Sequence, residues 1–486
     1  MSKNLAFYVV VLVLFGAGTG LLLNLGSKLR PEAAPASPAA AQASAHHATE
    51  GKAAGGAVHA LVENVRSPLS ILLFQVVLIV AAARGLGHLF GKIGQPPVIG
   101  EIVAGILLGP SLLGAVAPAA QAFLFPASSM DALRMLSEIG VILFMFVVGI
   151  ELDVEHLRQK ADAALLVSHA SIAVPFFLGT ASALLLYRRL APAGTPFSAF
   201  ALFLGIAMSI TAFPVLARIL DDRRMSRSFL GNTAIACAAV GDATAWCLLA
   251  AVVAIVGSGG LGGAALTLTL TVLFAAGMIL VVRPWIGRLL SSLPEGRVGS
   301  VGLLAALFAF IFAAALCTEA IGIHALFGAF LAGVCMPPDC GLRQFLRSRL
   351  ETFSSVLLLP LFFAFTGLRT QIGVLADWGS WAICLGLIVV AIVGKLGGGM
   401  MAARWTGMSW GDSFSLGTLL NARGLVELVV LNLGYDLGIL SPQIFAMLVL
   451  MALVTTFMTG PLLQLRAVLG RREAVVAAGG PTSVVP

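Results

Sequence analysis

Long apolar runs dominate the chain, and polar residues are largely confined to the short segments between them. An α-helix of about 20 apolar residues crosses a hydrocarbon layer of about 30 Å, and most of the runs reach that length. The pattern therefore predicts an all-α polytopic membrane protein. The runs lie at residues 5–25, 69–90, 97–114, 135–152, 163–187, 197–220, 228–256, 263–282, 300–321, 323–337, 353–369, 379–403, 411–435 and 442–465.

The composition excludes a water-soluble globule. Of the 486 residues, 59% are hydrophobic and 10% are charged, whereas about 25% are charged in an ordinary soluble domain. The net charge of +7 comes from basic residues between the apolar runs rather than on one soluble face. These residues indicate membrane topology, and we expect no nucleic-acid partner.

Changes in composition divide the chain into four parts. Residues 1–30 form an N-terminal membrane anchor or signal-like helix, and its length favours a retained anchor over a cleaved signal peptide. Residues 31–66, rich in Ala, Pro and Gly, are predicted to be a disordered linker, so the first helix should stand apart from the helical body. Residues 67–468 hold the transmembrane domain, and 469–486 form a short tail.

Lysine and arginine residues are concentrated in every second connection of the transmembrane domain, for example at Lys92, Arg158 and 223–227. Because cytoplasmic loops carry an excess of basic residues, these connections and the C-terminus are predicted to be cytoplasmic. The linker then lies outside. We expect a multi-pass protein of the cell (inner) membrane.

The thirteen spans after residue 67 divide as six, one and six, which places the two sixes in opposite orientation. LFMFVVGIEL (143–152) aligns without gaps on LFFAFTGLRT (361–370), and AGILLGP (104–110) matches the glycines and the proline of GAFLAGVCMP (328–337) in order. Inverted repeats of this kind are typical of secondary transporters. Chance similarity of apolar segments is the alternative.

The fifth span of each half contains residues that interrupt a helix. SITAFP (209–214) includes Pro214, which cannot donate a helical hydrogen bond, and GTLLNARG (417–424) places polar and glycine residues at the matching depth. Broken backbone is tolerated within a membrane only where it is buried in protein or lines a cavity. Two crossed broken helices therefore predict an ion site near the middle of the membrane, with Ser209, Thr211 and Asn421 as polar contributors.

Asp242 lies near the middle of the run 228–256. A carboxylate at that depth is costly unless it is paired, hydrated or protonated. Because desolvation disfavours its charged form, the same oxygens can hold either a proton or a dehydrated monovalent cation, so exchange follows from competition at one site. A structural salt bridge is the alternative.

Three further charged residues lie close in sequence to the predicted breaks or at the same depth. Lys395 either neutralises the negative ends of the broken helices, pairs with Asp242, or carries a proton itself, and spacing does not choose among these roles. Arg423 is always charged and is expected to hold carbonyl groups or a carboxylate such as Glu427. Weaker candidates are Glu101, Glu151, His169, Glu319 and His324.

The remaining chemistry gives little support to an enzyme or a metalloprotein. No Ser-His-Asp, HExxH or Walker-type spacing occurs, which argues against an enzyme. The six cysteines form no CxxC pair, so disulfides, a zinc site and a cofactor are not expected. The cysteines stand at 237, 247, 317, 335, 340 and 384.

Five motifs in order resemble the cation:proton antiporter superfamily, and within it the monovalent cation:proton antiporter-2 family of cation/proton exchangers and potassium efflux antiporters. The likeness covers residues 69–468. The motifs are GQPPVIGEIVAGILLGPSLLG (94–114), SITAFPVLARIL (209–220), the Gly-Asp pair 241–242, LPLFFAFTGLRT (359–370) and NARGLVELVVLNLG (421–434).

This resemblance implies a homodimer, an elevator-type movement, a role in pH homeostasis, and Asp242 as the essential residue that binds H⁺ and K⁺ or Na⁺. Relatives carry an aspartate or a glutamine just before this residue, whereas here it is Gly241. Lys395 thus lacks its customary partner, which argues for electroneutral exchange. We also expect no appended nucleotide-binding regulatory domain.

The sequence therefore predicts a secondary antiporter that exchanges a monovalent cation for H⁺ by alternating access. The alternative is a cation channel or passive cation pathway on the same scaffold. The identity of the cation, K⁺ or Na⁺, depends on the size of the site and its oxygen ligands, which the sequence does not show.

Overall fold

A computed structural model of the chain describes residues 3–29, 67–151, 161–226, 228–257, 261–291, 300–337 and 341–477. Within these ranges the regular structure is entirely helical. The predicted linker 31–66 lies outside them.

The first half of the transmembrane domain contains six spans, the fifth of which is interrupted. An additional N-terminal helix, α1 (Lys3–Gly26), precedes them, and short helices α5 (Leu113–Val116) and α6 (Pro118–Leu124) follow the second span. The six spans are α3 (Pro68–Lys92), α4 (Pro97–Leu108), α7 (Ala127–Glu151), α9 (Ala161–Leu190), the pair α10 (Phe197–Ser209) and α11 (Phe213–Asp222), and α12 (Phe229–Gly257).

A single span separates the halves. It begins as α13 (Leu261–Gly277) and continues through a short π-helix, 278–282, into α14 (Arg283–Ser291). The second half repeats the order of the first. Its spans are α15 (Val301–Ile321), α16 (Ala325–Val334), α17 (Gly341–Phe353) continuing into α18 (Leu359–Arg369), α19 (Trp378–Ile392) continuing into α20 (Gly398–Trp405), the pair α21 (Trp410–Leu420) and α22 (Leu425–Asp436), and α23 (Pro442–Ala477).

These helices confirm the predicted arrangement of six, one and six spans plus one N-terminal helix. Twelve described helices are long and apolar enough to cross a membrane, a further span is the α21/α22 pair bent by 43°, and the shorter α16 supplies the last. The apolar span of the last helix ends at Val468, and α23 continues beyond it to Ala477.

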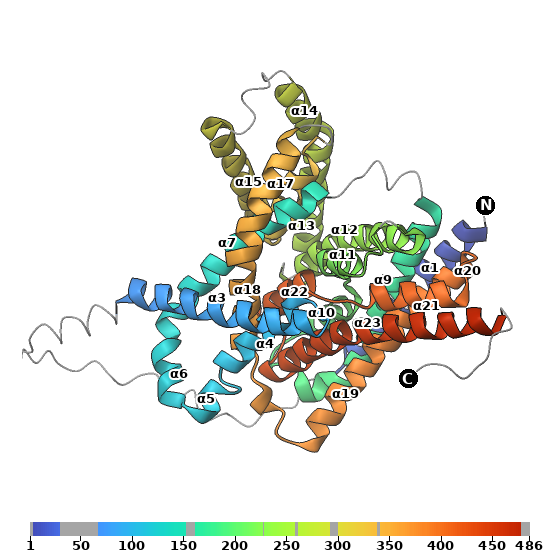
Figure 1. Cartoon of the computed structure of the whole chain (residues 1–486), viewed down its shortest axis with the longest axis horizontal. Coiled ribbons are helices and arrows are strands. Elements are labelled where there is room, and N and C mark those ends of the chain that lie inside the picture. The colour runs from blue at the N-terminus through green and yellow to red at the C-terminus, as the bar shows by residue number, and fades with distance from the viewer. Residues whose placement is uncertain are drawn as a thin grey trace, which may run out of the picture.

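The spans form two bundles, and each bundle contains three spans from the first half and three from the second (Figure 1). The broken-helix bundle contains α9–α12 and α19–α23, and the flanking bundle contains α3, α4, α7 and α15–α18, with α13 beside it. Apart from the consecutive helices α12 and α13, the main contacts between the bundles join α18 to α22 and α4 to α23. Buried hydrophobic side chains of both bundles belong to one core cluster.

Glycines permit close packing inside the flanking bundle. A side chain at Gly333 of α16 would collide with the carbonyl oxygen of Phe146 of α7, and one at Gly105 of α4 would collide with that of Ala364 of α18. The second span of each half thus packs in the same way on the third span of the other. These contacts make Gly105 equivalent to Gly333. Matching the glycines in sequence order pairs Gly105 with Gly328 instead, because it ignores that the glycines are spaced differently in the two helices.

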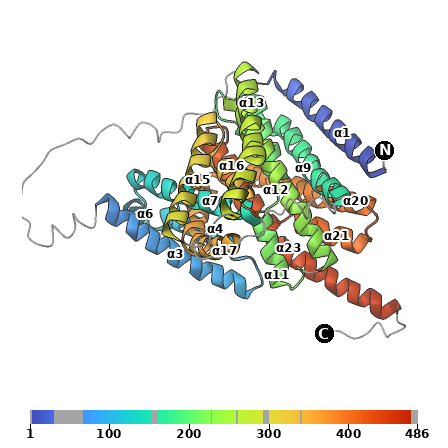
Figure 2. The same ribbon diagram turned by 90° about the horizontal axis from the view of Figure 1, so that it is seen from above.

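The prediction that the first helix stands apart is wrong. Helix α1 lies along α9 of the broken-helix bundle (Figure 2). The ring of Phe7 stacks on Trp405 with centroids 4.4 Å apart, and Phe15 meets Phe177 edge-on at 5.3 Å. A sequence linker limits only how far a helix can reach, whereas aromatic side chains decide where it packs.

Candidate functional site at the crossed helix breaks

The two interrupted spans cross at their breaks and are hydrogen-bonded to each other. Residues 210–212 separate α10 from α11, and 421–424 separate α21 from α22. The backbone N–H of Ala212 donates to the carbonyl of Ala422 at 3.2 Å, and the Thr211 hydroxyl donates to the carbonyl of Leu420 at 3.2 Å. Each break thereby satisfies backbone groups that the other leaves free, as burial in a membrane protein requires.

Two cationic side chains cover the C-terminal end of α10. Arg423 donates to the carbonyls of Ala207 and Met208, at 2.7 Å in each case, and Lys395 donates to the carbonyl of Ser209. The last carbonyls of a helix carry partial negative charge and have no partner within the helix, so cations are favourable there. Of the roles considered for Lys395, this geometry fits neutralisation of a broken-helix end.

Arg423 also holds a carboxylate. Its guanidinium lies 3.3 Å from Glu427 in the first turn of α22, and both side chains are fully buried. The backbone of Arg423 is fixed as well, because its N–H donates to Thr456 Oγ1 and its carbonyl accepts from the same hydroxyl, both at 2.9 Å. Arg423 therefore joins both breaks to α23.

Asp242 differs from Glu427, the other buried acid of the crossing, because no cationic side chain forms an ion pair with its carboxylate in the described structure. Its side chain is 1% exposed, and neither oxygen accepts a hydrogen bond from a side chain. The backbone N–H of Phe213 at the start of α11 is directed at the carboxylate, and the Lys395 ammonium is its charged neighbour. A helix N-terminus favours an anion, and a buried carboxylate without a side-chain partner is an acceptor in need of a proton or a cation.

The helices that pack against α12 carry other polar side chains without partners. Ser171 of α9, and Thr418 and Asn421 on α21 and its end, lack hydrogen bonds in the described structure. Helix α12, which carries Asp242, packs against both α9 and α21. Oxygen atoms of such groups are the ligands that monovalent cations prefer.

The position before Asp242 faces a neighbouring helix at close range. A Cβ atom on Gly241 would lie 3.4 Å from the Ser168 hydroxyl of α9, which donates to the carbonyl of Cys237 at 2.8 Å. No second carboxylate or amide occupies this position. The residue before Asp242 therefore adds no second titratable acid to the site.

The seven predicted site residues are all buried at the crossing, although they differ in how they are used. The hydroxyls of Ser209 and Thr211 donate to backbone carbonyls, that of Ser209 to Ile206 at 2.9 Å. In the described ranges no three His, Cys, Asp or Glu residues form a metal cluster. Cys340 lies outside those ranges, and the other five cysteines are free.

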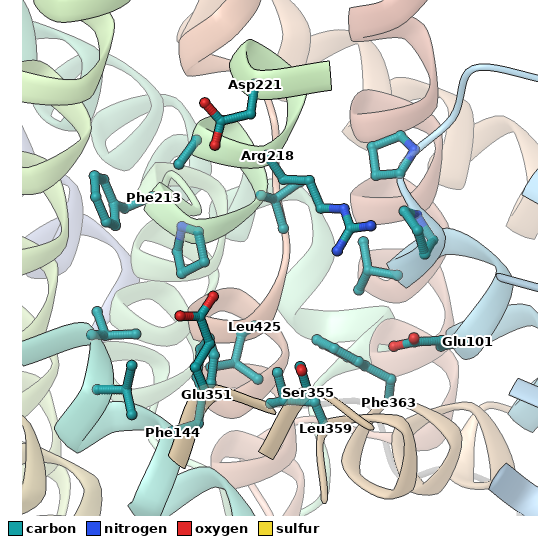
Figure 3. A pocket seen from close by; sticks show the side chains of 18 of the residues that line it. Glu101, Phe144, Phe213, Arg218, Asp221, Glu351, Ser355, Leu359, Phe363 and Leu425 are labelled. Atoms are coloured by element: carbon teal, nitrogen blue, oxygen red, sulfur yellow. The ribbon is translucent and has the colours of Figure 1, made fainter. Parts of the chain in front are cut away.

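A cavity of about 920 Å³ leads to the crossing between the two bundles (Figure 3). Its inner end is lined by Phe213 and Leu425, the first residues of α11 and α22. Arg218 and Glu351 extend into it from opposite walls, and Glu101 lies beside them. The cavity opens on the side that the basic loops predict to be cytoplasmic. Arg218 and Glu351 were not singled out from sequence.

The weaker candidates have separate positions. His169 of α9 hydrogen-bonds the carbonyl of Leu165 at 2.8 Å and meets the ring of Tyr8, so it packs α1 on the bundle. Glu319 accepts a hydrogen bond from the backbone of Ala325 at 2.9 Å. The side chain of Glu151 lies outside the described part of the structure.

Comparison with known proteins shows which family the chain resembles. The family model described as "Sodium/hydrogen exchanger, transmembrane" matches residues 76–465. The Na⁺/H⁺ antiporter NhaS4 of Synechocystis is 43% identical over 395 residues, which cover 81% of this chain and 96% of that protein. Cation/H⁺ antiporter 20 of Arabidopsis thaliana is 41% identical over 80% of this chain, and K⁺/H⁺ antiporter 1 of Saccharomyces cerevisiae is 33% identical over 83%.

This chain spans about half the length of the plant and yeast relatives, 48% and 47% respectively. Among solved structures, the sodium proton antiporter MjNhaP1 of Methanocaldococcus jannaschii has the same fold, with a TM-score of 0.61, 13% identity, and coverage of 81% of this chain and 96% of that one. The sequence matches over most of the transmembrane domain show that the chain belongs to the transmembrane sodium/hydrogen exchanger family.

Proposed function

We propose that this protein is a secondary antiporter that exchanges a monovalent cation, K⁺ or Na⁺, for H⁺, with Asp242 as the shared binding group. The observation that carries the proposal is the buried Asp242 carboxylate, which has no side-chain partner and lies beside the N-terminus of a broken helix. The named activities of the relatives, all of them antiporters, favour exchange over a channel.

Coupling follows from competition at Asp242. When its carboxylate is protonated, it offers no negative charge to a cation, and when a cation is bound, the proton has left. Thr211 and Asn421 line the same crossing and supply oxygen atoms that complete the cation's shell. One carrier site that never holds both ions moves them in opposite directions.

The charges around Asp242 support an electroneutral cycle. Arg423 is paired with Glu427, and Lys395 is bonded to the C-terminal end of α10, so both have fixed partners in the described structure. Asp242 is then the one acid of the crossing free to exchange its occupant, which gives one H⁺ for one cation. An imposed membrane potential should leave the exchange rate unchanged.

Alternating access follows from the two bundles. The cavity between them reaches the crossing from one side, and the bundles touch at few places. Movement of the broken-helix bundle past a flanking bundle that forms a homodimer would expose Asp242 on alternate sides. We place the protein in the cell (inner) membrane with its C-terminus in the cytoplasm, and C-terminal reporter fusions test this orientation.

The test is an exchange assay in proteoliposomes with an internal pH dye. Addition of K⁺ or Na⁺ should collapse an imposed pH gradient, and Asp242→Asn should abolish the response because an amide neither titrates nor neutralises a cation. Asp131→Asn, at an exposed position near the start of α7, is the matched control and should retain exchange. Wild-type exchange by Asp242→Asn would refute the mechanism, and conductive flux without a pH gradient would favour the channel.

A further inference from the structure

On the side opposite the cavity, one arginine joins the two bundles. Arg369, the last residue of α18, forms an ion pair with Asp436, the last residue of α22. Its guanidinium also donates to Asn432 Oδ1 at 3.0 Å. Helix α18 belongs to the flanking bundle and α22 to the broken-helix bundle, so each of these contacts crosses from one bundle to the other.

Stacking fixes the guanidinium in place. It lies 4.6 Å from the ring centroid of Tyr435 and 5.2 Å from that of Phe365, one ring from each bundle. Arginine is suited to this position because its planar group stacks on aromatic faces while its N–H groups donate in the plane. The side chain is 15% exposed, so water competes little for these contacts.

Two additional side chains reinforce the connection. The Asn432 amide donates to the Thr366 hydroxyl of α18 at 2.7 Å, in addition to accepting from Arg369. Arg134 of α7 lies 3.9 Å from Asp436. The end of α22 is therefore held by two helices of the flanking bundle.

The space enclosed by this network is small. The hollow among Arg134, Arg369 and Asp436 measures about 30 Å³, against about 920 Å³ for the cavity on the other side of the crossing. A space of this size holds at most a few water molecules. Access toward the crossing among the described residues is thus wide on one side and narrow on the other, and the narrow side coincides with the arginine network.

We propose that Arg369, Asp436 and Asn432 form an outer latch that keeps the outer entrance closed while the opposite cavity is open. The proposal rests on the proposed function, in which the broken-helix bundle moves. The break that leads into α22 is hydrogen-bonded to the other broken span at the crossing, so movement that opens the outer side must separate α22 from α18 and break the latch. Arg369 and Asp436 are positioning residues that set the balance between the two orientations without touching the transported ion.

The test measures access to each side independently of transport. In a variant whose six native cysteines are replaced by alanine, one cysteine is introduced either at Val429, beside the outer hollow, or at Ser355, in the opposite cavity. Arg369→Gln should accelerate labelling at 429 by a membrane-impermeant thiol reagent and slow labelling at 355, each by roughly fivefold or more. The charge-swapped pair Arg369→Asp with Asp436→Arg should restore slow labelling at 429.

Controls separate a latch from general loosening. Arg189→Gln breaks an ion pair of 3.1 Å with Asp377, but both residues belong to the broken-helix bundle, so labelling at both positions should stay unchanged. Faster labelling at both positions in Arg369→Gln would indicate local unfolding and overturn the proposal, as would unchanged labelling. If Arg369→Gln fails to fold, Asp436→Asn makes the same test. Because labelling needs no exchange, these outcomes do not depend on whether Asp242 carries ions.

Discussion

Removing the guanidinium of Arg423 tests the charge arrangement at the crossing. Arg423→Met leaves the buried Glu427 carboxylate without its partner at 3.3 Å, and breaking a buried ion pair in this way costs about 3–5 kcal/mol. The same change removes the donors to the carbonyls of Ala207 and Met208, and each buried acceptor left unpaired costs about 1–3 kcal/mol. The unpaired charge is the largest single contribution.

A second substitution separates these contributions. In the double variant Arg423→Met with Glu427→Leu, no charge is left unpaired, so we expect it to recover about 3 kcal/mol relative to Arg423→Met alone. The hydrogen bonds to the carbonyls of Ala207 and Met208 are still missing, so the double variant should remain less stable than the wild type. SDS-induced unfolding of purified protein, followed by far-ultraviolet circular dichroism, gives the free energies.

Two outcomes would refute this reasoning. Equal stability of Arg423→Met and the double variant would show that Glu427 is not the source of the cost. Wild-type stability of Arg423→Met would show that α10 does not need the guanidinium. Arg189→Met is the control, because Arg189 is half-exposed and its ion pair lies at the surface, where such pairs contribute little.

Two further predictions concern packing and pH. Gly333→Ala should destabilise the protein by about 1–3 kcal/mol because its methyl group meets the Phe146 carbonyl, whereas Gly85→Ala, with open space around it, should be neutral or stabilising in the same SDS titration. The hydrogen bond from the Ser380 hydroxyl lowers the pKa of Asp377 below its ordinary value. A carboxyl group whose pKa is lower in the folded state stabilises the protein at pH values above its unfolded-state pKa. This stabilisation is lost as the pH falls through its folded-state pKa. Asp377→Asn should therefore lower the melting temperature at pH 7 and have no effect in acid; an effect independent of pH would contradict this.

The candidate site shows how far sequence alone reached. Asp242 was identified because a carboxylate in the middle of an apolar run is costly, and the breaks were identified from Pro214 and from polar residues at matching depth. Sequence alone leaves three possible roles for Lys395. The hydrogen bond to Ser209 involves a residue 186 positions away, and no local pattern encodes such a contact.

The latch illustrates the same limit. In the sequence, Arg369 is only one residue of the repeated motif 361–370, and nothing distinguishes Asp436. Their pairing depends on the ends of α18 and α22 meeting where the bundles touch. The sequence likewise does not indicate that Arg218 and Glu351 line the same cavity, because this cavity exists only between helices from different bundles.

The sequence by itself determined the number of spans, the inverted repeat, the interrupted helices and the presence of a buried acid at Asp242. Each of these follows from local properties: the length of an apolar run, the missing N–H of a proline, or the cost of a charge in lipid. Only the tertiary structure decided that α1 packs on the broken-helix bundle, that Asp242 lacks a partner while Arg423 and Lys395 have theirs, and that one face is closed. These features arise from contacts between helices far apart along the chain, whose geometry depends on how all the side chains pack together.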